Sequence, residues 1–482
     1  MEERQRMKKD LEMVLRLNNT LDYDNREDVE KNYNRILQER LFQTSLGERY
    51  TKKLEKMVYG AAPPQNCIFC KGIRDNASVI CDKCQTLYGR QVHLEKESVS
   101  AQYGGKAAVE EKPDKAPAVA EIDAEQLAAL SKQAAEAFRG SLDTFTSKIN
   151  EMAGGSGAVD LKLRDLFSSV FKKHTRAESE EIFIAGTLKT TPAESEIAVS
   201  WPKPWLFSRV WLALLVSYSL LYICSAQFYN ANTLPGLMFI GALVMPFSVL
   251  IFLFETNAPR NISIFEVVKM FFVGGAASLV LTLFLFTIFP VGELDYIGAF
   301  IVGVVEETGK LLAIILFVKA LKPKYILNGM LIGASVGAGF AVFETAGYAF
   351  RQFEAGVAWG FDKGIDRMAE VLFLRGWSSL GGHVAWAAVT GAGLVLVKGA
   401  GSLTKSNLTN RRFQKFFLIP VILHGIWDCP FMGGSMEYAC IKMAVLIVTI
   451  WIVILVLLHA GLKQIERICA DEEQTAEIRN KN

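Results

Sequence analysis

Long apolar segments dominate the second half of the chain. Eight of them follow residue 204, near residues 205–228, 232–254, 264–289, 295–321, 326–350, 376–398, 411–432 and 439–462. Each segment is long enough to cross the hydrocarbon core of a bilayer, which is about 30 Å thick. No soluble core absorbs so many apolar runs, which argues against a single soluble enzyme. The sequence therefore predicts an all-α polytopic membrane protein with about eight transmembrane helices.

Charge is divided unevenly along the chain. Residues 1–200 hold 30 of the 52 Lys and Arg residues and 32 of the 50 Asp and Glu residues, which leaves 22 basic and 18 acidic residues for the remainder. The first part is therefore expected to be water-soluble. Its 30 basic and 32 acidic side chains give a net charge of −2, so no nucleic-acid partner is expected.

Basic residues in the connections predict the orientation of the membrane segments. They follow the fourth, sixth and eighth segments: Lys319, Lys322, Lys324, Lys398, Lys405, Arg411, Arg412, Lys415, Lys463 and Arg467. The connections at 229–231, 290–294 and 433–438 carry no Lys or Arg. The positive-inside rule then places both termini in the cytosol and the 351–375 connection outside. With no apolar stretch at its start, the chain is expected to be a multi-pass protein of the cell membrane without a signal peptide.

Four cysteines form two C-x-x-C pairs, CIFC and CDKC. They are Cys67, Cys70, Cys81 and Cys84. In a reducing compartment this arrangement indicates a metal site, because four thiolates give Zn²⁺ a closed tetrahedral shell. A redox dithiol needs only one such pair and is the less favoured reading. Residues 65–90 are therefore predicted to form a zinc ribbon with a structural zinc ion.

The other soluble segments are predicted from spacing and composition. Residues 1–60 combine charge with recurrent apolar positions and are expected to form a helical cytosolic arm. This arm is either a self-association surface or a solvated pair of helices. Residues 98–122 are rich in Ala, Lys, Glu and Pro and are expected to be a linker. Residues 123–176 are expected to form amphipathic helices, and 463–482 a cytosolic tail.

Ionisable residues occur inside four consecutive membrane segments. They are Glu306, Glu307, Lys310, Glu344, His383, His424 and Asp428. Such groups are costly in lipid and are functional candidates by default. At about 1.5 Å per residue, Glu306 lies roughly 15–18 Å from the outer end of its helix, and the residues on the neighbouring helices lie at similar levels. The sequence thus predicts a water-accessible cavity in the outer half of the bilayer.

Carboxylates and histidines together suit the activation of water. A Glu can act as a general base, and a His can stabilise an oxyanion or bind a metal. Inside a membrane, this chemistry indicates hydrolysis of a peptide bond near a membrane segment. The chain lacks an H-E-x-x-H motif, so the zincin helix is excluded.

In these motifs the chain resembles the PrsW family of intramembrane proteases, which is related to the CAAX-processing and bacteriocin-immunity proteases. The resemblance covers about residues 205–460, and it implies an eight-helix protease domain over 205–462. The family pattern is a double Glu with a basic residue, then F-x-x-x-E, a lone His and H-x-x-x-D. It is matched in order by Glu306, Glu307, Lys310, Phe340, Glu344, His383, His424 and Asp428. The N-terminal zinc ribbon departs from the minimal family member and leaves the substrate and regulation open.

The resemblance also implies roles for these residues. Glu306 is expected to be the general base, with Glu307 held by Lys310. His383 and His424 would bind a metal or the oxyanion. A catalytic zinc ion, where one is used, would take its ligands from His383, His424, Asp428 and Glu344. A buried ion pair that only fixes helix packing is the alternative for the Glu–Lys group.

The resemblance implies cleavage of a membrane-anchored protein from the extracytoplasmic side, an anti-sigma factor in the case of PrsW itself. The expected partners are therefore this substrate and the lipid bilayer. Two other functions stay open. A transporter or channel would use the polar residues to carry ions, and a non-catalytic scaffold would recruit partners through the zinc ribbon.

Overall fold

The computed structural model describes residues 2–23, 25–39, 41–42, 44–59, 67, 80, 84, 124–292, 294–430 and 436–481. It confirms the prediction of an all-α protein, because these described residues form helices and no strand. The chain divides into two compact units, Met1–Glu121 and Ile122–Asn482.

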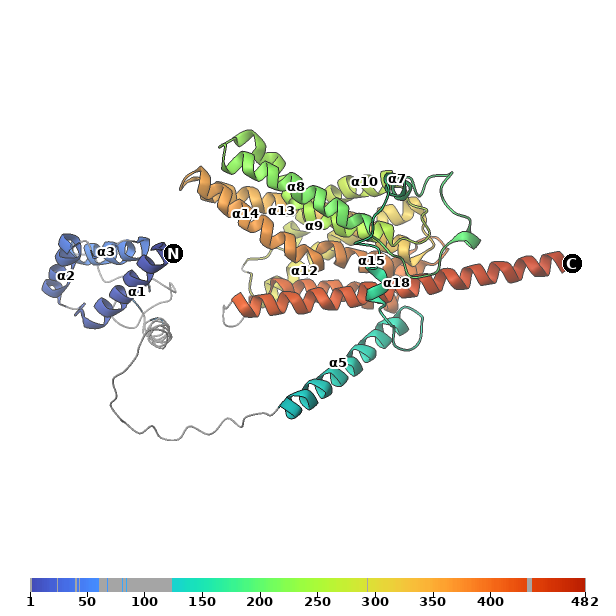
Figure 1. Ribbon diagram of the computed structural model, residues 1–482, viewed down its shortest axis with the longest axis horizontal. Coiled ribbons are helices and arrows are strands. Elements are labelled where there is room, and N and C mark those ends of the chain that lie inside the picture. The colour runs from blue at the N-terminus through green and yellow to red at the C-terminus, as the bar shows by residue number, and fades with distance from the viewer. Residues whose placement is uncertain are drawn as a thin grey trace. The chain divides into compact units, whose positions relative to one another are not determined.

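Among its described residues, the first unit contains helices α1 (Glu2–Thr20), α2 (Arg26–Glu39) and α3 (Ser45–Val58), drawn in blue in Figure 1. Asp10 connects α1 to the start of α3, because its Oδ2 accepts hydrogen bonds at 2.7 Å from both the backbone N–H and the hydroxyl of Thr44. The core comprises buried apolar residues that recur at helical spacing: Val14, Leu17, Val29, Tyr33, Ile36, Tyr50 and Leu54.

Three described residues of the predicted zinc ribbon belong to the same core. Cys67, Ile80 and Cys84 are buried in the cluster formed by α1, α2 and α3. The backbone N–H of Ile80 donates to Oδ1 of Asn18 at 3.1 Å, so this segment contacts α1. Cys70, Cys81 and most of residues 65–90 lie outside the described residues, as does the linker predicted at 98–122. The zinc ribbon therefore stays a prediction.

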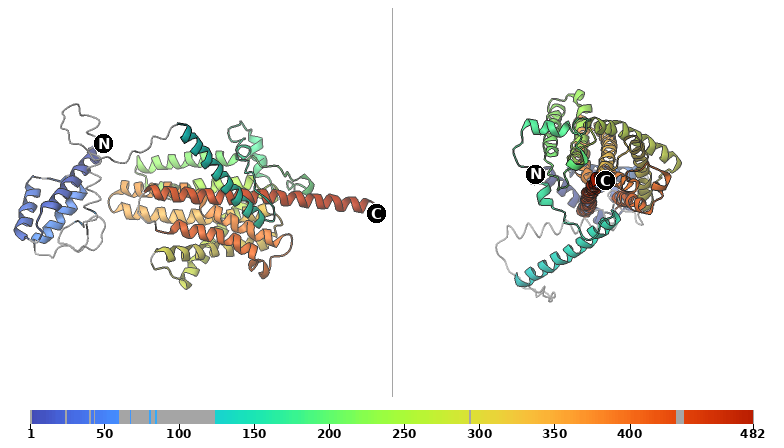
Figure 2. Two further views of the ribbon diagram at one scale, coloured as in Figure 1. Left: turned by 90° about the horizontal axis from the view of Figure 1, so that it is seen from below. Right: turned by 90° about the vertical axis from the view of Figure 1, so that its right-hand side faces the viewer.

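The second unit is a helical bundle with short helices before it (Figures 1 and 2). Its long helices are α5 (Ala124–Met152), α8 (Leu206–Ala226), α9 (Leu234–Glu255), α11 (Gly275–Ile288), α12 (Tyr296–Leu321), α13 (Ile326–Val357), α14 (Phe361–Ser378), α15 (His383–Lys398), α17 (Arg411–Asp428) and α18 (Met436–Lys481). Its short elements are α6 (Leu163–Leu166), α7 (Arg176–Phe183), η1 (Glu194–Glu196), η2 (Ala231–Thr233), α10 (Ile264–Lys269), η3 (Met270–Gly274), η4 (Ser379–Gly381) and α16 (Lys405–Leu408). The end of α18 extends past the other helices of the bundle (Figure 2), so the predicted tail continues the last helix.

Six helical segments of the described residues are long and apolar enough to span a membrane: Leu206–Ala226, Ala231–Glu255, Ile264–Ile288, Ile326–Val357, Phe361–Lys398 and Tyr438–Asp471. Six of the eight predicted membrane segments therefore meet this criterion of length and composition. The other two are α12 and α17, which pack against each other. Both carry several charged residues, because α12 contains Glu306, Glu307 and Lys310 and α17 begins with two arginines.

Small residues allow α13 and α15 to lie in close contact. Gly329, Gly333 and Gly337 lie one turn apart on α13, and a Cβ atom on Gly333 would lie only 1.9 Å from the carbonyl oxygen of Ala387 in α15. A Cβ on Gly337 would lie 2.3 Å from the carbonyl oxygen of His383. The three glycines therefore permit the approach that places His383 beside α13.

The structure corrects the interpretation of residues 351–375 as a connection. Helix α13 continues to Val357, and α14 then runs back along α13 as a helix of its own. The reason is amphipathicity, because α14 buries Ile365, Met368 and Leu372 and exposes Asp366 and Glu370. The predicted sixth segment is also interrupted at η4 before α15 begins.

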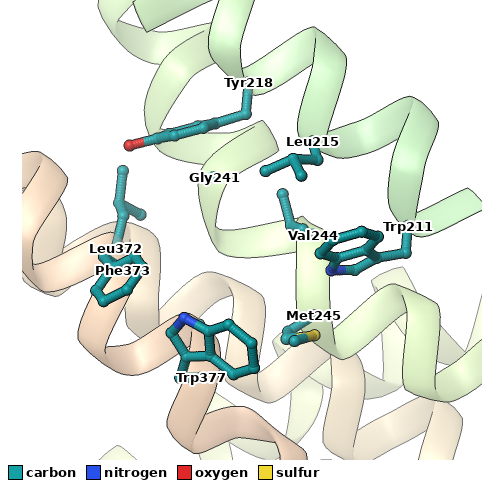
Figure 3. Close-up of a pocket in the computed structure, with 10 residues that line it drawn as sticks. Trp211, Leu215, Tyr218, Gly241, Val244, Met245, Leu372, Phe373 and Trp377 are labelled. Atoms are coloured by element: carbon teal, nitrogen blue, oxygen red, sulfur yellow. The ribbon is translucent and has the colours of Figure 1, made fainter.

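The end of α14 faces the hairpin of α8 and α9 across an apolar cavity of about 310 Å³ (Figure 3). Trp211, Leu215 and Tyr218 line it from α8, and Phe373 and Trp377 line it from α14. The chain continues from this cavity through η4 directly to His383. The segment from Phe373 to His383 thus runs from the apolar cavity to the polar residues inside the bundle.

Candidate active site

Four helices place ionisable side chains around one polar cavity of about 240 Å³. Glu306 comes from α12, Glu344 from α13, His383 from the first turn of α15, and His424 and Asp428 from the last turns of α17. All five line the cavity. The same segments that the sequence singles out are therefore brought together in space, although they span more than 120 residues of the chain.

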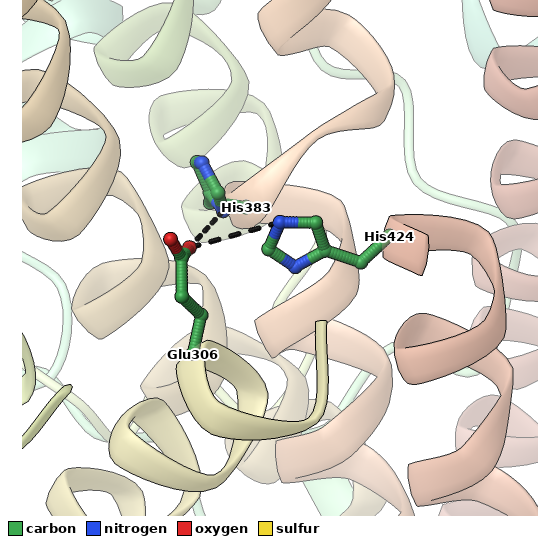
Figure 4. Close-up of side chains that lie close together, drawn as sticks. All are labelled: Glu306, His383 and His424. Carbon is green, nitrogen blue, oxygen red and sulfur yellow. Dashed lines mark ion pairs between the residues drawn. The ribbon is translucent and has the colours of Figure 1, made fainter. Parts of the chain in front are cut away.

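Glu306 lies between the two histidines, as Figure 4 shows. Its Oε2 atom lies 3.9 Å from Nδ1 of His383 and 3.7 Å from Nε2 of His424. This oxygen is buried and has no hydrogen-bond partner among the described residues. A buried carboxylate oxygen without a partner is costly, so the position calls for a cation or a bound polar group.

Glu307 fixes the orientation of His424. Nδ1 of His424 lies 2.9 Å from Oε1 of Glu307, whose side chain is fully buried. A carboxylate only accepts, so Nδ1 donates, and Nε2 of the ring is turned toward the cavity. That Nε2 atom lies 3.3 Å from Oδ2 of Asp428.

Glu344 fixes the orientation of His383 in the same way. Nε2 of His383 donates to Oε2 of Glu344 at 2.9 Å, which leaves Nδ1 directed toward Glu306 and Lys310. Each histidine therefore gives one ring N–H to a carboxylate and turns its other nitrogen toward a common point beside Glu306. This arrangement of outer carboxylates is typical of histidines that bind metals.

Lys310 is buried beneath the cavity and supplies the nearest positive charge. Its Nζ atom lies 2.6 Å from Glu307, 2.8 Å from Nδ1 of His383 and 3.7 Å from Glu306. The ammonium also lies 4.4 Å from the ring centroid of Phe340, within cation–π range. Lys310 thus balances part of the negative charge of the two adjacent glutamates.

Two residues that the sequence interpretation left out of the site line the cavity. Trp386 stacks on His424 with ring centroids 4.4 Å apart, so it restricts the movement of that ring. Arg375 in α14 forms an ion pair with Glu344. Arg375 lies at the end of the segment 351–375, which the sequence interpretation treated as a connection. An arginine eight residues before His383, next to an apolar run, was the available signal.

The cluster fits a metal ion by its donor set. Glu306, His383 and His424 each offer a ligand atom, and these atoms lie within 4.8 Å of one another. Two imidazoles and one carboxylate are a ligand set that zinc uses in catalytic sites, where a further position stays open for water. The Glu306 oxygen that lacks a hydrogen-bond partner supports this fit. Glu344 and Asp428, which the sequence interpretation placed among the ligands, each lie beside one histidine, 2.9 Å from Nε2 of His383 and 3.3 Å from Nε2 of His424.

Comparison with known proteins agrees with this site. Residues 263–458 match the family model described as PrsW family intramembrane metalloprotease. No curated protein and no solved structure gives a significant match. The matched range contains all four helices that line the cavity, together with α14. Residues 263–458 are therefore similar to the PrsW family of intramembrane metalloproteases.

Proposed function

We propose that the chain hydrolyses a peptide bond of a membrane-anchored protein in the cavity between α12, α13, α15 and α17. The observation that carries this proposal is the convergence of Glu306, His383 and His424 on one point, inside a bundle of membrane-spanning helices. Such groups are costly in lipid, and a cavity that collects them provides the water that hydrolysis needs.

Glu306, His383 and His424 would hold a divalent metal ion, most simply zinc. When bound there, such an ion would favour ionisation of a coordinated water molecule and polarise the scissile carbonyl group. Glu307 and Glu344 keep the two imidazole rings in the orientation that presents Nε2 of His424 and Nδ1 of His383 to this point.

Asp428 is the carboxylate best placed to accept a proton from the attacking water. It is the last residue of α17, lines the cavity and is more exposed than Glu306. In hydrolysis the water oxygen adds to the carbonyl carbon, the C–N bond breaks, and the departing nitrogen takes up a proton. A carboxylate at the cavity wall can hold this proton between the two steps.

We also propose that α12 and α17 cross the membrane, although each carries several charged residues. They pack against each other, and Glu306 of α12 and His424 and Asp428 of α17 line the cavity. The positive-inside rule then keeps both termini in the cytosol and opens the cavity toward the outer half of the bilayer. Cleavage would therefore take place near the extracytoplasmic end of the substrate.

The soluble segments have separate proposed roles. Residues 65–90 form a zinc ribbon through Cys67, Cys70, Cys81 and Cys84, and residues 1–60 form the helical arm on which it packs. The burial of Cys67 and Cys84 within the core of α1, α2 and α3 supports this proposal. The arm would present the ribbon in the cytosol.

Comparative membrane proteomics of cells that express the wild-type protein or the Glu306→Ala variant tests the proposed function. An uncut membrane-anchored protein should accumulate with Glu306→Ala. Glu354→Ala is the matched control, because Glu354 lies exposed on α13 and away from the cavity. Equal processing of all membrane proteins with wild type and Glu306→Ala, at equal expression, would contradict the protease and favour a scaffold.

A further inference from the structure

Arg375 is held in one position by three contacts on a single face of α13. Its Nη2 atom donates to Oε2 of Glu344, and its Nε atom donates to the hydroxyl of Thr345 at 3.0 Å. Its guanidinium carbon lies 4.4 Å from the ring centroid of Tyr348. A planar guanidinium group that donates hydrogen bonds to two residues and stacks on a third has little freedom to rotate.

The main chain at Arg375 is tied to the same region. Its carbonyl oxygen accepts hydrogen bonds from the hydroxyls of Ser378 at 3.1 Å and Ser379 at 2.6 Å. These bonds stabilise the turn through η4 that leads from α14 to His383. Arg375 therefore connects α14, α13 and the start of α15.

The oxygen that Arg375 holds is the one that orients His383. Oε2 of Glu344 accepts from Arg375 and also from Nε2 of His383. Without Arg375, the Glu344 side chain could rotate, and its charge would lie beside the cavity without a cation partner on its own side. The ring of His383 would then lose the contact that directs Nδ1 toward Glu306.

We propose that Arg375 is a positioning residue that acts on His383 through Glu344 and so sets the geometry of the metal centre. This inference deepens the proposed function and rests on it. Arg375 holds the carboxylate, the carboxylate holds the imidazole, and the imidazole offers its second nitrogen to the metal. No step requires Arg375 to contact the substrate.

Titration of the purified full-length protein with Co²⁺ tests this chain of contacts. Cobalt binds the same nitrogen and oxygen donors as zinc and absorbs visible light according to its coordination. The absorption of cobalt bound at the predicted cysteine site is removed by subtracting the spectrum of the His424→Ala variant. The remaining signal reports the site of Glu306, His383 and His424.

We expect Arg375→Ala to weaken this His424-dependent cobalt binding about tenfold and to change its spectrum. In a Glu344→Gln background, the same substitution should weaken cobalt binding further by less than about twofold, because the contact through which Arg375 acts on His383 is already altered. Arg375→Lys should recover part of the affinity, since a lysine keeps the charge but cannot bond Glu344 and Thr345 together. It also serves as the test if Arg375→Ala fails to fold.

Arg367→Ala is the matched control, because Arg367 lies exposed on the same helix, where its Nη1 atom donates to the carbonyl oxygen of Ala355 at 3.4 Å. It should bind cobalt like wild type. Unchanged binding by Arg375→Ala, or a tenfold loss in both backgrounds, would overturn the inference and leave the proposed function intact. Absence of any His424-dependent signal in the wild type would overturn the proposed metal centre and the inference together.

Discussion

His424 and Glu307 are joined by a buried hydrogen bond of 2.9 Å between Nδ1 and Oε1, although they lie 117 residues apart in the chain. This bond connects α17 to α12 below the cavity and leaves Nε2 of His424 facing Glu306. Glu307 is in turn bonded to Lys310 at 2.6 Å. His424, Glu307 and Lys310 thus form a buried polar network beside the cavity, in which each side chain orients the next.

Glu307→Gln should weaken metal binding at the site without removing a ligand. The amide still offers an oxygen to His424, but it lacks the charge that strengthens the hydrogen bond and raises the basicity of the imidazole. We expect zinc affinity to fall about 10- to 100-fold, measured by competition with a coloured chelator. Glu370→Gln on α14, which lies exposed and outside the cavity lining, should have no effect. Equal affinities for wild type and Glu307→Gln would contradict the role of the outer carboxylate.

Lys310→Met should destabilise the bundle, because it leaves Glu307 buried without its cation. Removal of one partner from a buried ion pair costs about 3–5 kcal/mol. The double variant Glu307→Gln, Lys310→Met should recover part of this loss, since residue 307 then carries no buried charge that needs a cation. Thermal unfolding in detergent measures both effects. Lys463→Met, at a pair that is about half exposed, should change little. A wild-type unfolding temperature for Lys310→Met would contradict the buried pair.

Gly333→Ala should disrupt the contact of α13 with α15. The added Cβ would lie 1.9 Å from the carbonyl oxygen of Ala387, which is backbone and cannot move aside cheaply. Overpacking of this kind costs about 1–3 kcal/mol, and it should also displace His383 and weaken metal binding. Gly347→Ala on the same helix is the control, because a Cβ there meets no atom within 4 Å. Its stability should stay equal or rise slightly through better helix propensity.

Cys67→Ser should release zinc from the N-terminal unit and destabilise its helices, because Cys67 is buried in their core. The membrane site should keep its own metal, since it lies in a separate unit of the chain. Circular dichroism and metal analysis before and after chelation measure these two effects. Cys440→Ser, at an exposed cysteine of α18, should leave both unchanged. An N-terminal fold that is indifferent to zinc would refute the ribbon.

Much of the fold could be predicted from sequence because each membrane segment carries its own signal. A run of about twenty apolar residues identifies a spanning helix without knowledge of its neighbours. The same rule explains where the prediction was incomplete. Residues 361–378 are amphipathic and charged, so they resemble a loop until their apolar face is seen to pack on α13 and α9.

The site residues could be found because charge is rare in these helices, but their pairing could not. Spacing along a helix relates Glu307 to Lys310, which are three residues apart. It gives no information on the contacts of Glu307 with His424 or of Glu344 with His383, which depend on how the helices pack. The grouping of Glu306 with the two histidines within 4.8 Å likewise depends on how α12, α15 and α17 pack, which spacing along one helix does not give.

The role of Glu306 separates two versions of the mechanism. If Glu306 is a metal ligand, which the geometry favours, its replacement by Gln should lower the affinity for zinc. If Glu306 is the general base, which the family resemblance implies, the same replacement should abolish cleavage while the metal stays bound. Metal analysis of Glu306→Gln beside wild type distinguishes the two roles.

Anomalous scattering measured at the zinc absorption edge, from crystals of the full chain grown with zinc, tests the central claim most directly. The account predicts an anomalous peak within bonding distance of Glu306, His383 and His424. The peak should be absent from crystals of His424→Ala. A wild-type map without density at this point, with Lys310 still bonded to Nδ1 of His383, would contradict the metal centre.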